Sequence, residues 1–200
     1  MNKRIIINIL LLILTLLEFS KLYLTPEIHE IIGITLILLL IIHLIQNKTY
    51  IKTITQARTQ KLLLITNTLL LITFTSTIIT GLLSSQTMTI LNIHIITSNY
   101  LHKILAHFTL TLISIHLGLN IKFILNRIKE KISNKHVQQI IAAIILLLGI
   151  ISFIQVDYIN HLTGNIGFSA NNTNILINIL QYLSIILSTA IITYYITSDK

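Results

Sequence analysis

Two stretches of the sequence repeat one pattern of histidines, small residues and asparagine. They are TPEIHEIIGITLILLLIIHLIQN over 25–47 and SNYLHKILAHFTLTLISIHLGLN over 98–120. The matched positions are Thr25/Ser98, His29/His102, Gly33/Ala106, His43/His116 and Asn47/Asn120. Imidazole is a common protein ligand of iron, so each stretch offers two side chains of the kind that holds a haem.

The spacing within each stretch suits a helix that crosses a membrane. Fourteen residues of α-helix rise roughly 21 Å and end about 40° short of whole turns, so both histidines lie near one face. Two such helices, side by side and parallel, would form two bis-imidazole sites stacked across the bilayer. Such ligation leaves iron no open position and favours electron transfer. We therefore predict two non-covalent b-type haems, with these axial ligands: His29 with His102, and His43 with His116.

Other residues of the repeat are candidates for contact with the same cofactors. Gly33 and Ala106 lie one turn from the outer ligands, where a larger side chain would press on the porphyrin. Asn47 and Asn120 could hydrogen-bond the propionates of the inner haem, although asparagine at a helix end is also a common cap. Lys103 is a candidate propionate partner at the outer haem.

Composition places these helices in a membrane. The 200 residues are 54% hydrophobic and 10% charged, with a mean hydropathy of +0.85. The absence of cysteine excludes disulfides, thiolate metal sites and covalent c-type haem. Runs long enough to cross a bilayer predict an all-α bundle of six transmembrane helices, with the haems between the parallel second and fourth. The predicted spans are 5–24 (an uncleaved first span), 25–45, 61–83, 98–120, 137–155 and 173–196.

These spans divide the chain into three parts. Residues 1–120 form the predicted four-helix haem-binding core with its internal repeat, 121–136 a basic cytoplasmic linker, and 137–200 two further transmembrane helices. With six spans, twelve of the fourteen basic residues fall on one side, which predicts a multi-pass protein of the cell membrane with both termini cytoplasmic. The net charge of +8 then reflects topology and attraction to membrane lipid, and no nucleic acid partner is expected.

At these motifs the chain resembles a known family. The blocks HExxG…IHLxxN and LHxxxAH…IHLGLN, with TGLLSS closing the span between them, resemble the flavinylation-associated cytochromes of prokaryotic membranes. They are more distantly similar to the haem core of cytochrome b and formate dehydrogenase-type cytochrome b subunits. The resemblance covers about 21–120 and implies b-haem electron transfer across the membrane, to or from flavoproteins whose FMN is attached outside the cytoplasm.

The resemblance also implies that the same four histidines are the axial ligands. The chain has no soluble FMN-carrying domain and no Asp-x-x-Ser/Thr-Gly-Ala-Thr motif, so a flavin would sit on an extracytoplasmic partner and not on this chain. We expect an electron-transfer subunit, with a quinone or membrane donor, rather than a stand-alone enzyme. Two alternatives stay open: a His-lined metal or proton transporter, and a structural membrane anchor of a redox complex.

The remaining polar residues of the spans are expected to lie outside the ligand set. His107 is about 140° around the helix from His102. Asn67, in the third span, is expected to hydrogen-bond a neighbouring helix. Three histidines in or beside loops are expected to be solvated or interfacial, with a proton relay near a quinone as the alternative: His94, His136 and His161.

Overall fold

The computed structural model describes residues 3–48, 58–85, 99–122, 125–126, 130, 132, 134–165 and 174–198. Within these ranges the regular structure is helical throughout, which confirms the all-α prediction. The elements are α1 (Lys3–Glu18), the 3-10 helix η1 (Lys21–Tyr23), α2 (Pro26–Gln46), α4 (Arg58–Leu83), α6 (Asn99–Asn120), α8 (Lys135–Gln155), α9 (Tyr158–Thr163) and α10 (Ile175–Ser198).

The described ranges hold seven α-helices where the sequence predicted six. The additional helix is α9, which falls in a segment predicted to be a loop. It follows Asp157, whose backbone is left-handed at φ 53° and whose carboxylate accepts from Asn160 Nδ2. Its first residue, Tyr158, is buried. A helix of six residues is too short for its hydrophobic period to be recognised in the sequence.

Four helices are long and apolar enough to cross a membrane: α2, α4 over Lys61–Leu83, α8 and α10 over Ile175–Thr197. The chain is therefore a helical membrane protein by this measure, and its described residues contain four such spans where we predicted six. α1 has only 16 residues and rises about 24 Å. α6 is long enough at 22 residues, but its histidines, Lys103 and several hydroxyl residues make it less apolar.

The beginning of α2 follows from its first residues. Thr25 has an extended backbone, and its side chain accepts a hydrogen bond from the Ile28 amide at 3.4 Å. Pro26 occupies the first helical position, where it has no amide hydrogen to leave unpaired. Thr25 is therefore the N-cap of α2. The matching residue of the repeat, Ser98, lies outside the described residues.

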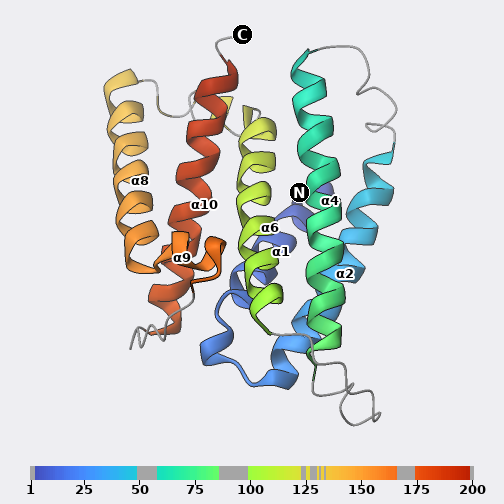
Figure 1. Cartoon of the computed structure of the whole chain (residues 1–200). Helices are drawn as coiled ribbons and strands as arrows, with labels where there is room; N and C mark the ends of the chain where they lie inside the picture. The colour runs from blue at the N-terminus through green and yellow to red at the C-terminus, as the bar shows by residue number, and fades with distance from the viewer. Residues whose placement is uncertain are drawn as a thin grey trace.

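The helices alternate in direction along the chain, so α2, α6 and α10 run one way and α1, α4 and α8 the other (Figure 1). α2 and α6 are therefore parallel, as the repeat predicted. The closely packed pairs are α1 with α2, α4 with α6, α6 with α10, and α8 with α10. The histidine-bearing helices α2 and α6 are not such a pair, so side chains rather than backbones meet between them.

Small residues bring the backbones of α6, α8 and α10 together. A Cβ atom on Gly118 of α6 would lie 2.5 Å from the Ala190 carbonyl oxygen of α10. A Cβ atom on Gly149 of α8 would collide with the Ser188 side chain. In a membrane, where lipid is as apolar as leucine, close packing of this kind is a main source of helix association.

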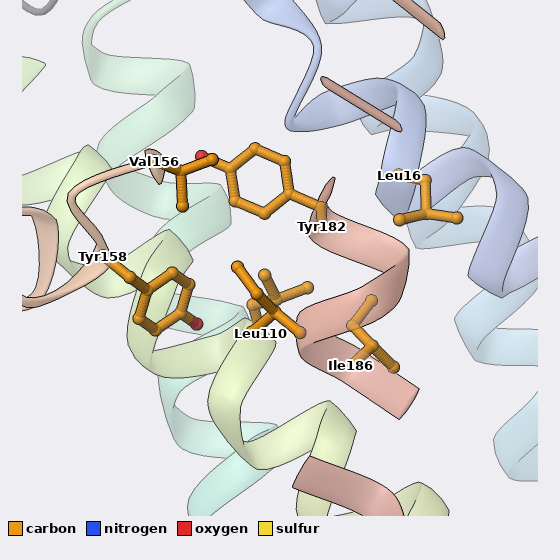
Figure 2. Close-up of a cluster of buried hydrophobic side chains, with 7 residues drawn as sticks. Leu16, Leu110, Val156, Tyr158, Tyr182 and Ile186 are labelled. Atoms are coloured by element: carbon orange, nitrogen blue, oxygen red, sulfur yellow. The ribbon is translucent and has the colours of Figure 1, made fainter. Parts of the chain in front are cut away.

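The buried core lies around the lower half of α6 and α10, as drawn in Figure 1. Figure 2 shows Leu110 of α6 between the rings of Tyr158 and Tyr182, with Ile186 of α10 and Leu16 of α1 nearby. Leu110 and Ile186 are completely inaccessible to solvent. By contrast, α2 buries only Leu36. Most of its large apolar side chains are exposed, as is expected of a helix that faces lipid.

Candidate functional site

The outer histidines of the repeat lie close together, one on α2 and the other on α6. The ring centres of His29 and His102 are 6.3 Å apart, and the ring planes are almost perpendicular at 86°. The structure thus brings together the two residues that the repeat pairs at its outer end. They are the first histidine of each helix, four residues after Thr25 in α2 and three residues into α6.

The His102 ring is held from behind by α4. Its Nδ1 lies 2.9 Å from the Thr77 carbonyl oxygen and 3.4 Å from Thr80 Oγ1. A carbonyl oxygen can only accept, so Nδ1 carries the proton and Nε2 keeps the lone pair. Gly81 lies against the same ring, because a Cβ atom there would approach His102 Cε1 to 2.9 Å. The absence of a side chain at Gly81 therefore makes room for the imidazole.

The His29 ring is held from behind by α1. Its Nδ1 lies 2.8 Å from Glu18 Oε2, a close contact with a carboxylate that is not aligned as a hydrogen bond. Both side chains are mostly buried, with 16% of His29 and 17% of Glu18 exposed. Glu18 also approaches Gly33, where a Cβ atom would be 3.9 Å from Oε1. The carboxylate favours the proton on Nδ1, so Nε2 again keeps the lone pair.

The inner histidines are held in the same way by asparagines. His43 Nδ1 donates to Asn8 Oδ1 of α1 at 2.9 Å, and His116 Nδ1 donates to Asn67 Oδ1 of α4 at 2.6 Å. The bond between Asn67 and His116 confirms the predicted helix–helix hydrogen bond. His43 and His116 lie near enough to interact electrostatically, and their pairing at one metal stays a prediction.

One arrangement therefore recurs at all four histidines. Each Nδ1 faces an acceptor on the preceding helix, and each Nε2 is left as the nitrogen with a lone pair. The acceptors are spaced ten residues apart in both copies: Asn8 and Glu18 in α1, Asn67 and Thr77 in α4. The sequence analysis missed Asn8, Glu18, Thr77 and Gly81 as site residues. One signal for them was present in the sequence. The helix before each histidine helix carries an asparagine, Asn8 or Asn67, ten residues before the second acceptor.

Four other residues predicted to contact a cofactor occupy two settings, and Lys103 is described with the second histidine cluster below. Gly33 and Ala106 are partly buried on the two histidine helices. Asn47 Nδ2 donates to the His43 carbonyl at 2.8 Å and lies 3.5 Å from His43 Nε2, while Asn120 Nδ2 donates to the His116 carbonyl at 2.7 Å. Both asparagines thus pair with the backbone of the inner histidine in their own helix. The outcome agrees with the capping alternative that the sequence left open.

A second histidine cluster lies on the other side of α6. His107 is buried, and its ring stacks on His161 of α9 with centres 4.5 Å apart and planes 2° from parallel. His107 Nδ1 donates to the Lys103 carbonyl at 2.8 Å, and Nε2 lies 3.4 Å from the Tyr182 hydroxyl. Lys103 thus lies on the α9 side of α6, where its charge opposes protonation of His161.

His161, which was expected to be solvated or interfacial, is partly buried in α9. Burial lowers the pKa of His161, and the nearby Asp157 carboxylate partly opposes this shift. Burial also raises the pKa of Tyr158 to about 12, and the Tyr158 hydroxyl donates to the His107 carbonyl. The cluster is a packed part of the core in which the rings contact each other. His136 is exposed at the beginning of α8, and His94 lies outside the described residues.

The outer pair has the dimensions of a two-histidine metal axis. Two imidazoles that bind one metal ion from opposite sides, each through a nitrogen about 2 Å from the metal, have ring centres roughly 6 Å apart. The 6.3 Å between the His29 and His102 centres agrees with this separation. Acceptors at both Nδ1 atoms are the usual support of metal-bound histidines. In the described part of the chain, no three His, Cys, Asp or Glu side chains form a metal-binding group.

No protein-family model matches the chain, and neither the curated proteins nor the solved structures contain a match.

Proposed function

We propose that the chain is a di-haem b-type cytochrome that carries electrons across the cell membrane. The observation that carries this proposal is the geometry of the outer pair, in which the centres of two imidazole rings lie 6.3 Å apart. His29 and His102 would hold the outer haem, and His43 and His116 the inner one. Each haem would supply a reversible one-electron iron couple that exchanges no ligand.

The chain's own residues prepare the ligands. Glu18 and Thr77 keep the proton of the outer histidines on Nδ1, and the two asparagines do the same for the inner ones. This leaves four Nε2 atoms in the form that binds iron and limits rotation of the rings. Gly33 and Ala106 leave space beside the outer ligands. Asn47, Asn120 and Lys103 are candidate propionate partners with weaker support, because their described contacts are within or behind the helices.

The membrane topology completes the proposal. α1 and α6 would cross the bilayer with the four apolar helices, so that both termini lie in the cytoplasm on the side rich in basic residues. The 22 residues of α6 rise about 33 Å, enough to cross the hydrocarbon core. Its polar side chains would face α2, α4 and α9 rather than lipid. The shorter α1 would require local thinning of the bilayer, which costs little per ångström.

The proposed redox partners are other molecules, because we find no second redox motif in the sequence. Electrons would pass between a quinone or membrane donor and an extracytoplasmic redox protein, with a flavin carried by that protein. The chain is then a subunit of an oxidoreductase system. A His-lined metal transporter is less well supported, because the described residues contain no cluster of three or more metal-binding side chains.

The direct test is a dithionite-reduced minus oxidised visible spectrum of the purified protein, with haem counted per polypeptide. We expect the sharp bands of low-spin b-type haem and two haems per chain. One haem per chain would mean that one of the two pairs does not bind iron. A chain without haem, made by a host that supplies enough of it, would overturn the proposal, and metal analysis would then test the transporter alternative.

A further inference from the structure

The four acceptors behind the histidines are not chemically equivalent. Asn8, Asn67 and the Thr77 carbonyl are neutral, whereas Glu18 is a carboxylate. The difference is confined to the outer site, because both inner histidines face amides. Glu18 is the last residue of α1 and reaches into the interface with α2, where it contacts His29 and approaches Gly33.

We propose that Glu18 is a positioning residue that makes the outer haem the lower-potential haem of the two. This inference rests on the proposed function, since it assigns to Glu18 an effect on iron bound by His29. The contact between Glu18 and His29 determines whether the potential of the outer haem is raised or lowered. A carboxylate 2.8 Å from Nδ1 stabilises positive charge on the imidazole and makes Nε2 a stronger donor to the metal. Stronger donation favours the oxidised iron, which carries one more positive charge.

Burial strengthens the effect. Only 17% of the Glu18 side chain is exposed, and its second oxygen, Oε1, is buried and has no hydrogen-bond partner. A negative charge with little water around it is weakly screened, so its field extends to the position between the outer rings. The neutral amides at the inner site exert no such field. The expected difference in potential between the two haems therefore comes from α1, which places a carboxylate at the outer site and an amide at the inner one.

A purely structural role for Glu18 predicts something different. If Glu18 only holds α1 against α2, it could be replaced by any side chain of similar shape that makes the same contact with His29 Nδ1. Glutamine meets this requirement and lacks the charge. Glu18→Gln therefore separates the two roles, because the haem potential responds to the charge and the helix contact does not depend on it.

The experiment measures midpoint potentials by redox titration of single-haem forms. His116→Ala removes an inner ligand, so the remaining haem is the outer one, and Glu18→Gln is then introduced into this background. We expect the outer potential to rise by at least the equivalent of a tenfold change in the one-electron equilibrium, about 59 mV. Glu27→Gln is the matched control, since it removes an exposed acid near the same end of α2 and should leave the potential unchanged.

The converse variant places the charge at the inner site. In the His102→Ala background, which leaves the inner haem, Asn8→Asp puts a carboxylate behind His43 and should lower the inner potential. If Glu18→Gln loses the outer haem, this variant still tests whether a carboxylate at such a position lowers the potential, and an unchanged inner potential would overturn the proposal. Shifts of opposite sign in the two variants support the proposal.

If the unaltered chain holds both haems and Glu18→Gln leaves the outer potential unchanged, the proposed role of Glu18 is overturned. The proposed function then remains intact. If the unaltered chain held no haem, both proposals would fall together, and the haem count would show this before any variant was made.

Discussion

The two sides of α6 are built in opposite ways. The side towards α10 is completed by the protein's own atoms: Leu110 is fully buried, and Gly118 allows the Ala190 backbone to approach closely. The side towards α2 carries His102 and His116, and α2 itself buries a single residue, Leu36. The interface with α10 is close-packed. On the side towards α2, imidazole rings lie between the helices, and the rings of α6 are hydrogen-bonded to α4. In the proposed function, the second interface is the one that would hold the haems.

The largest effect should come from removing the histidines. We expect His29→Ala and His102→Ala each to abolish the outer haem and keep the inner one, because a single imidazole cannot maintain bis-histidine ligation. His43→Ala and His116→Ala should do the converse. Haem content per chain and the reduced spectrum are the measurements. His136→Ala, at an exposed position, is the control and should retain two haems. Retention of both haems after any of the four changes would refute the pairing.

Two glycine variants should separate the sides of α6. Gly118→Leu inserts a side chain where even a Cβ atom lies 2.5 Å from Ala190 O, so we expect overpacking to destabilise the protein by about 1–3 kcal/mol. Gly33→Leu meets only a 3.9 Å contact and should leave the stability of the haem-free chain unchanged while lowering its haem content. Thermal unfolding in detergent, followed by circular dichroism, gives the first comparison, and haem content gives the second. Equal stability losses in the two variants would remove the contrast between the interfaces.

A smaller and more local effect is expected at Gly81. A methyl group there would approach His102 Cε1 to 2.9 Å, so Gly81→Ala should displace the ring from its position against α4. We expect reduced occupancy of the outer haem and full occupancy of the inner one, measured as haem per chain. The matched change is Gly33→Ala on the facing helix, where a Cβ atom makes only ordinary contact. Normal occupancy in Gly81→Ala would show that the ring is free to move.

The smallest effect should come from the second histidine cluster. His107→Phe keeps a flat ring to stack on His161 but loses the bond to the Lys103 carbonyl and the 3.4 Å contact with Tyr182. We expect a loss of stability of about 1 kcal/mol and two haems per chain as before. Unfolding temperature and haem content are measured together. A fall in haem content would mean that the two histidine clusters are functionally connected.

Much of this arrangement could be predicted from the sequence, because the repeat sets the helices and their direction. The all-α fold, the parallel α2 and α6, and the approach of His29 to His102 follow from a fourteen-residue period and one intervening crossing. α9 could not be predicted, since its six residues depend on the tertiary burial of Tyr158. Glu18 was overlooked because an acid at a helix end is usually solvated. Its role depends on where α1 meets α2, which no local pattern determines.

The reduced hydropathy of α6 has a consequence for biogenesis. A helix with three histidines and a lysine enters lipid at a cost when it is alone. Paired with α4, it shares the Thr77–Thr109 contact at 3.1 Å and the bonds from its outer and inner histidines to Thr77 and Asn67. We therefore expect α6 to leave the insertion machinery together with α4 as a helical hairpin, already hydrogen-bonded. The acceptors that orient the histidines in the mature protein would then also carry the helix into the membrane during synthesis.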